Sequence, residues 1–220
     1  MAKAKKKKPK PKAAPVVPET PRHLKLFYGS SYDRGLEHLL AMWPEIIKAF
    51  PTAELHVFYG WDLYDKAFQN NPERLAWKAR MNDDMTQTGI THHGRVSKAE
   101  LAKGQDICGI WAYPTHFGET NCITALDCQY HGCVPVVMDL AALSETVQSG
   151  VKVEGDIYDE ETQAAYLQAL LELMGNPVKW AAEQAKGREF APRFSWSNIA
   201  KTWVQVFTDP AVQGQAVTAA

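Results

Sequence analysis

The alternation of short β-rich runs with longer helical patterns is the feature that most constrains how this chain can fold. Six runs rich in β-branched and aromatic residues are predicted strands: 24–28, 55–59, 90–93, 107–112, 134–138 and 151–153. Between them, apolar residues recur at spacings of three and four, most clearly at Leu36, Leu39, Leu40, Trp43, Ile46 and Ile47. Strands separated by helices form right-handed β-α-β crossovers and a parallel sheet. We therefore expect a doubly wound, Rossmann-like α/β fold of about six strands with helices on both faces.

The first 23 residues differ in composition from the rest of the chain. They hold seven lysines, all within residues 3–12, and five prolines, and no acidic residue precedes Glu19. Because this segment has little to bury, we expect a disordered leader over 1–23, a folded domain over 24–207 and a flexible tail over 208–220. A block of lysines attracts nucleic acid, an anionic membrane surface or an acidic protein, and it also serves as a solubilising arm.

Composition excludes several classes of protein. With 220 residues, 45% of them hydrophobic, and a net charge of −1, the chain can bury a core and is not disordered throughout. No run approaches the roughly 18–20 apolar residues of a membrane-spanning helix, and no secretory signal is visible. We therefore expect a cytoplasmic protein with reduced, buried cysteines: Cys108, Cys122, Cys128 and Cys133.

Ligands of a doubly wound sheet bind beyond the carboxyl ends of its strands, where the strand order reverses. The first strand is followed by Gly29-Ser30-Ser31-Tyr32-Asp33-Arg34-Gly35, a small turn before a helix predicted to begin near Asp33. Backbone N–H groups and the helix dipole would seat a phosphate there, and an anion would suit Arg34. The loop matches neither G-x-G-x-x-G nor the P-loop, so an ordinary capped turn with a surface arginine is the alternative.

A second loop follows the fourth strand and leads into a helix predicted from Thr120 to His131, closed by Gly132. Glu119 near the helix start also suits a structural cap, whereas Asp127 lies among apolar residues and needs a cleft or a partner. Eight helical residues rise about 12 Å. The two carboxylates could therefore hold a hexose hydroxyl and the ribose hydroxyls of a sugar nucleotide, with its diphosphate against the first loop.

The run Phe117-Gly-Glu119-Thr-Asn-Cys-Ile-Thr-Ala-Leu-Asp127, with the glycine, proline and valine that follow it, resembles the E-x7-E signature of family 4 glycosyltransferases. Residues 30–36 are similar to the phosphate-side loop of that family, 141–147 to its segment after the fifth strand, and 194–196 to its closing helix. The similarity spans 24–207. It implies the C-terminal, donor-binding lobe of a GT-B fold, and retaining hexosyl transfer from UDP- or GDP-hexose without a metal or other cofactor.

The resemblance assigns roles position by position. Glu119 would be the catalytic residue and contact the donor sugar, Asp127 the ribose and Arg34 the diphosphate. The backbone of residues 115–118 would donate to the leaving group. The other expected donor-binding residues lie in the same loops and after the third strand: Gly29, Ser30, Ser31, Arg95, Lys98, His116, Phe117, Gly118, Thr120 and Asn121.

Three features depart from the family pattern. Its second signature residue is usually glutamate, and Asp127 is one methylene shorter. The family commonly places an arginine and a lysine five positions apart on the diphosphate. Here Gly29 replaces the arginine and Arg34 the lysine, so Arg95 or Lys98 would have to compensate. The N-terminal acceptor-binding lobe is also missing. We therefore expect a partner chain or a second copy to supply the acceptor side. The alternative is a non-catalytic nucleotide-sugar-binding or interaction module derived from a split or truncated glycosyltransferase.

The remaining candidates have structural interpretations. His92 and His93 are expected to be satisfied polar residues at a strand end, with His116 the histidine to test. The cysteines and His131 show no C-x2-C pair, so no metal site is expected, and no G-x-S-x-G elbow indicates a hydrolase. All seven tryptophans are expected in the core: Trp43, Trp61, Trp77, Trp111, Trp180, Trp196 and Trp203.

Overall fold

The computed structural model describes residues 19–209, and most of the expected leader and tail (1–18 and 210–220) lies outside the described residues. One parallel sheet in the order β3-β2-β1-β4-β5-β6 forms the centre of the fold and confirms the doubly wound α/β prediction. Its strands are β1 (Lys25–Tyr28), β2 (Glu54–Phe58), β3 (Ile90–Gly94), β4 (Ile110–Tyr113), β5 (Val134–Met138) and β6 (Val151–Val153).

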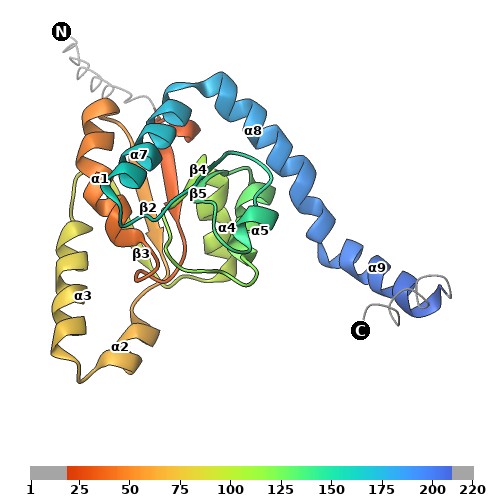
Figure 1. The fold of residues 1–220 in the computed structure, drawn as a ribbon, viewed down its shortest axis with the longest axis horizontal. Helices are drawn as coiled ribbons and strands as arrows, with labels where there is room; N and C mark the ends of the chain where they lie inside the picture. Colours follow the sequence, from red (N-terminus) through yellow and green to blue (C-terminus); the bar gives the residue numbers. More distant parts are fainter. Residues whose placement is uncertain (1–18, 210–220) are drawn as a thin grey trace, which may run out of the picture.

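Helices cover the sheet in two groups (Figure 1). They are α1 (Leu36–Ala49), α2 (Asp62–Phe68), α3 (Pro72–Asp84), α4 (Lys98–Ile107), α5 (Ile123–His131), α6 (Leu143–Thr146), α7 (Glu160–Gly175), α8 (Pro177–Phe190) and α9 (Trp196–Thr208), with 3-10 turns η1 (Arg22–Leu24) and η2 (Ala191–Phe194). Helix α1 packs on α3 and α7, and α4 packs on α5. No helix within residues 19–209 combines the length and apolar character needed to cross a bilayer.

Helix starts follow local capping chemistry. Asn71 and Asn176 cap helices whose first residue is proline, and Ser97 with Glu100 forms a capping box at α4. Two predicted starts were too early. Helix α1 begins at Leu36 after a turn that ends in left-handed Gly35, and α5 begins at Ile123.

Because α5 begins at Ile123, Glu119 lies outside the helix. The distance between the Glu119 and Asp127 carboxylates therefore cannot be taken from the rise of a helix, as the sequence analysis did.

The core confirms part of the tryptophan prediction. Trp43 and Trp111 are fully buried, and Trp61, Trp77 and Trp180 pack against the core with partial exposure. The prediction was wrong for Trp196 and Trp203, which are 89% and 62% exposed. Both lie on α9, which extends away from the sheet and buries none of its residues (Figure 1).

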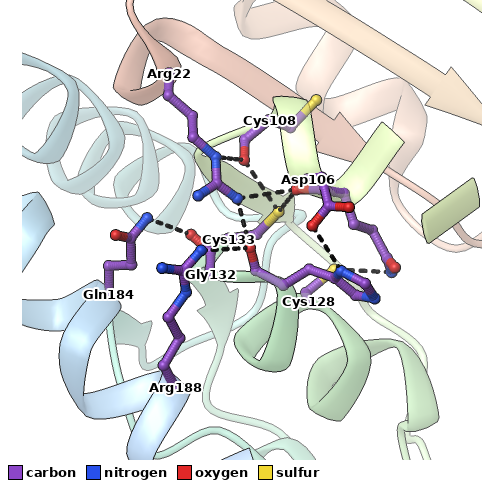
Figure 2. Close-up of polar contacts among 10 residues, drawn as sticks. Arg22, Asp106, Cys108, Cys128, Gly132, Cys133, Gln184 and Arg188 are labelled. Carbon is purple, nitrogen blue, oxygen red and sulfur yellow. Dashed lines mark hydrogen bonds and ion pairs between the residues drawn. The ribbon is translucent and has the colours of Figure 1, made fainter. Parts of the chain in front are cut away.

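Arg22 ties the start of the domain to the ends of two helices (Figure 2). Its Nε donates to the carbonyl of Cys108 at 2.7 Å, and its Nη2 donates to those of Gln105 at 3.1 Å and His131 at 2.6 Å. These carbonyls belong to the C-terminal ends of α4 and α5, where a cation complements the helix dipole and satisfies orphan acceptors. The folded unit thus includes a residue that the sequence analysis assigned to the leader.

The four cysteines are buried and unpaired, as predicted. The Cys133 thiol donates to the carbonyls of Gln105 and Cys108 at 3.1 and 3.4 Å (Figure 2). Burial raises the pKa of the Cys122 thiol to about 11 and that of Cys108 still further. These thiols therefore behave as small apolar side chains.

Candidate functional site

The loops that follow β1 and β4 meet at the point where the strand order reverses. Strand β1 pairs with β2 on one side and β4 on the other, all parallel, so both loops emerge from the carboxyl edge. Gly35 in the first loop has φ of 106°, and a Cβ there would lie 2.2 Å from the carbonyl oxygen of Pro114. This close backbone approach requires glycine, and it brings the two predicted site loops together.

Within this contact, an ion pair and two polar side chains form one network. Arg34 Nη1 lies 3.2 Å from Glu119 Oε1, and the Tyr113 hydroxyl donates to the same oxygen at 2.8 Å. Since that proton is committed to Glu119, Ser30 Oγ donates to the Tyr113 oxygen at 3.2 Å. Burial raises the pKa of the Tyr113 phenol well above its usual value, which keeps it a donor. The predicted residues Ser30, Arg34 and Glu119 are thus brought together.

Phe117 fixes the position of the Arg34 guanidinium. The guanidinium carbon lies 3.8 Å from the centre of the Phe117 ring, which is a cation–π contact. The side chain of Arg34 is 35% exposed and that of Glu119 is 13% exposed, so both still face solvent. Arg34 is therefore held between an aromatic face and a carboxylate at the mouth of a cavity.

That cavity has a volume of about 220 Å³ and lies between the two loops and the start of α5. It is lined by Gly29, Ser30, Ser31, Arg34, Tyr59, Glu119, Asn121, Cys122, Ile123 and Thr124. We call it the central cavity. No side chain caps α5, and its N-terminal residue Ile123 lines the cavity, so the positive end of the helix dipole lies beside this space. The sequence analysis placed the anion seat in the loop after β1, before α1, and Gly29, Ser30, Ser31 and Arg34 of that loop line the same cavity.

The backbone of residues 115–118 was expected to donate to a ligand, and half of it is engaged within the loop. The Thr115 N–H donates to the Tyr113 carbonyl at 2.9 Å, and the Phe117 N–H donates to the Thr115 hydroxyl at 3.0 Å. A ligand would have to compete with these internal acceptors for the two N–H groups. The His116 and Gly118 N–H groups have no acceptor within residues 19–209 and face no such competition.

Asp127 faces a cavity, as its mid-helix position predicted. This cavity of about 450 Å³ is lined by Asn121, Ile123, Leu126, Asp127, Tyr130, Ala191, Phe194, Ser195, Trp196 and Ile199. Desolvation by these mostly apolar neighbours raises the pKa of the Asp127 carboxyl, against opposing effects of His131 and Lys98. The positive charge of Lys98 thus favours the ionised form of the Asp127 carboxyl. Asn121 and Ile123 line both this cavity and the central one, so the two adjoin.

A third cavity adjoins the central one at Gly29 and Tyr59. It has about 200 Å³ and a mostly apolar lining: Gly29, Phe58, Tyr59, Leu63, Arg95, Val96 and Leu101. Arg95, rather than Lys98, is therefore the cation on this side. Tyr59 has φ of 145°, an unusual backbone conformation for a residue with a side chain. The sequence analysis missed Tyr59, because nothing in a β-rich run marks a positive φ.

His116 lies away from the central cavity. It lines another cavity, of about 400 Å³, with Arg34, Trp77 and Tyr158, and this cavity adjoins the central one at Ser31 and Arg34. The Tyr158 hydroxyl lies 3.3 Å from His116 Nδ1. His38 packs against both rings; burial lowers its pKa, and its Nε2 has no partner within residues 19–209. His38 and Tyr158 carry no motif, so the sequence analysis missed both.

Of the remaining candidates, His92 and His93 are satisfied as predicted, by Tyr32 at 2.7 Å and His56 at 3.0 Å. Thr120 is exposed and is not among the residues that line these cavities. Within residues 19–209, no group of three or more histidine, cysteine, aspartate or glutamate side chains is placed to hold a metal ion.

Comparison with known proteins finds similarity in structure only. No family model and no curated protein sequence matches the chain. The solved GtfA/B complex superposes with a TM-score of 0.68 at 13% identity, over 86% of this chain and 36% of that one. Sucrose-phosphate synthase from Thermosynechococcus elongatus gives 0.64 at 20% identity (89% and 46%), and Anabaena HepE in complex with UDP-glucose gives 0.62 at 13% (84% and 48%).

This chain therefore spans between a third and a half of the length of these structures. These solved structures are glycosyltransferases, and the feature that the chain shares with them is the Rossmann-like α/β fold.

Proposed function

We propose that this chain is a nucleotide-sugar-binding domain of a family 4-like glycosyltransferase, which takes part in retaining transfer of a hexose from UDP- or GDP-hexose. The central cavity is the observation that carries the proposal. It places one arginine, one carboxylate and an uncapped helix start at the switch point of a doubly wound sheet. HepE, which has the same fold, was solved in complex with UDP-glucose.

The diphosphate of the donor would lie in the central cavity. Arg34 and the N-terminus of α5 supply positive charge from two sides, and the small residues Gly29 and Ser30 allow close approach. Arg95, across the third cavity, is the second cation within reach of this side. Arg95 would take the role of the diphosphate-binding arginine of family 4, which Gly29 replaces in this sequence.

The two ends of the donor would extend into the adjoining cavities. The mostly apolar space beside Tyr59, Arg95 and Val96 suits a nucleobase, and Asp127 is a hydroxyl acceptor for the ribose. Glu119 would accept a hexose hydroxyl through the carboxylate oxygen that Arg34 and Tyr113 do not bind.

Transfer requires the departing diphosphate to be stabilised as negative charge develops. Arg34 and the N–H groups at the start of α5 are fixed before reaction and would stabilise that charge without a metal ion. Water must also be excluded while the anomeric carbon reacts. The structurally similar GtfA/B was solved as a complex, and we propose that a partner chain or a second copy supplies the acceptor side here.

Calorimetric titration of the full chain with UDP and GDP tests the donor site. We expect one of them to bind, and Arg34→Ala and Asp127→Ala each to weaken binding by roughly 10–100-fold, the value of a charge-assisted hydrogen bond. Glu189→Ala on the exposed face of α8 is the matched control and should bind as the wild type. Wild-type protein that binds neither nucleotide would contradict the proposal.

A non-catalytic binding module is the second candidate. The pairing of Glu119 with Arg34 and Tyr113 favours it, since one carboxylate oxygen is already satisfied within the chain. The two candidates differ in a transfer assay with UDP- or GDP-hexose. Activity that Glu119→Ala abolishes, and that persists in a metal chelator, supports the transferase. Nucleotide binding without transfer supports the binding module.

A further inference from the structure

The apolar face of α9 is the largest feature of the fold that the donor site does not explain. Four apolar side chains recur along it at spacings of three, four and three: Trp196, Ile199, Trp203 and Val206. This is the spacing of a helix that buries one stripe against another helix. Yet no residue of α9 is buried, and Figure 1 shows the helix extending away from the sheet.

The exposed surface continues from α9 onto the body of the domain. Ile123 and Tyr130 of α5 are 65% and 57% exposed, and Phe194 of η2 is 44% exposed. All three line the Asp127 cavity together with Trp196. One apolar surface thus runs from the nucleotide end of the candidate site along α9.

From this surface we propose that the chain forms a symmetric dimer in which α9 packs antiparallel against α9 of a second copy. The proposal goes beyond the donor site and does not depend on nucleotide binding. Trp203 lies close to the middle of α9, so in an antiparallel pair it meets its own counterpart near the two-fold axis.

The area available agrees with a specific dimer. An aromatic side chain buries roughly 150–250 Å². With their exposed fractions, the two tryptophans and the apolar side chains around the Asp127 cavity offer roughly 500 Å² or more per copy. A symmetric pair would bury on the order of 1,000 Å², the lower limit for specific interfaces.

Charge and composition favour a second copy over the rest of the chain as the occupant. Lys201 is the one charged residue within Trp196–Thr208, so two copies of α9 meet with little repulsion. Residues 1–18 hold seven lysines, which match an apolar surface poorly, and residues 210–220 contain two valines as their largest apolar side chains.

Light scattering with size-exclusion chromatography of the full chain is the first test. We expect a mass twice the 24.6 kDa of one chain. Trp203→Glu should weaken dimerisation by about 100-fold or more, because the charge enters the interface twice. Gln205→Glu, on the opposite side of α9, is the matched control and should remain dimeric. A wild-type chain that stays monomeric at every concentration measured overturns the proposal.

Crosslinking tests the geometry without disrupting the interface. Trp203→Cys should form a covalent dimer with a short bismaleimide, whereas Lys201→Cys on the polar face should not. The four native cysteines are buried and contribute little background. Equal crosslinking of the two variants would exclude the antiparallel pairing through Trp203.

Discussion

Arg34 and Glu119, 85 positions apart in the sequence, form an ion pair of 3.2 Å across the switch point of the sheet. The arginine comes from the loop after β1 and the carboxylate from the loop after β4. The proposed donor site assigns a ligand contact to each of these two residues. They satisfy one another within the chain, so a diphosphate that binds Arg34 must compete with Glu119 for the guanidinium.

This competition predicts opposite effects on binding and transfer. Glu119→Gln removes the negative charge beside Arg34, so UDP or GDP should bind about 3–10-fold more tightly, as expected for loss of a partly exposed competing charge. Any hexosyl transfer should be lost. Calorimetry and a transfer assay on the same preparation check both. Glu189→Gln on α8 is the control, and weaker nucleotide binding by Glu119→Gln would show that Arg34 does not meet the diphosphate.

Gly35→Ala should separate the two site loops. The residue has φ of 106°, and the added Cβ would lie 2.2 Å from the Pro114 carbonyl oxygen, so backbone must move. We expect a loss of at least about 2 kcal/mol in the free energy of unfolding, together with weaker nucleotide binding. Denaturant titration measures the first. Gly118→Ala is the matched control, because its nearest neighbour, the Ala141 Cβ, lies 3.7 Å away; equal stability of the two variants would refute the steric argument.

Arg22→Ala should destabilise the domain without touching the site. It removes the charged donor from the Gln105 and Cys108 carbonyls, which within residues 19–209 keep only the Cys133 thiol, and leaves the His131 carbonyl with the longer Arg188 bond of 3.3 Å. This should cost about 2–4 kcal/mol and lower Tm by roughly 5–15 °C. Arg22→Lys should recover only part of the loss, because one ammonium cannot reproduce the planar fork. Calorimetric melting compares both with Arg80→Ala on exposed α3. An unchanged Tm in Arg22→Ala would mean that water satisfies these carbonyls equally well.

Asp127 should make stability depend on pH in an unusual direction for a carboxylate. Its pKa is raised by desolvation from the ordinary 3.8, so the folded state favours the protonated form. That contribution is present at pH below 3.8 and is lost as pH rises through the raised pKa. The Tm of the wild type minus that of Asp127→Asn should therefore fall as pH increases across this window. A difference that rises with pH would assign Asp127 a charged partner in the folded protein.

Strand positions followed from the sequence because buried parallel strands leave continuous apolar runs, such as those of β1 and β5. The helix starts at Leu36 and Ile123 did not, because they depend on backbone turns that residue types alone do not fix.

The sequence predicted which residues belong to the candidate site better than it predicted the contacts between them. Arg34, Glu119 and Ser30 were found from loop position, and the family resemblance gave them roles. Tyr113, which joins two of them, is a strand residue by pattern and carried no such signal. Trp196 and Trp203 show the opposite error, since an apolar helical stripe looks the same whether it faces a core or another chain.

The pairing of β1 with β4 has a mechanical consequence. It is registered at only two residue pairs, Leu26 with Ile110 and Phe27 with Trp111, whereas β1 with β2 and β4 with β5 have four each. This short β1–β4 pairing joins the two halves of the sheet, and the central cavity lies beyond the carboxyl ends of these two strands. A molecule bound there would contact both halves of the sheet at once and would hold β1 and β4 together. Ligand binding in the central cavity would therefore also stabilise the domain against separation of the two halves of its sheet.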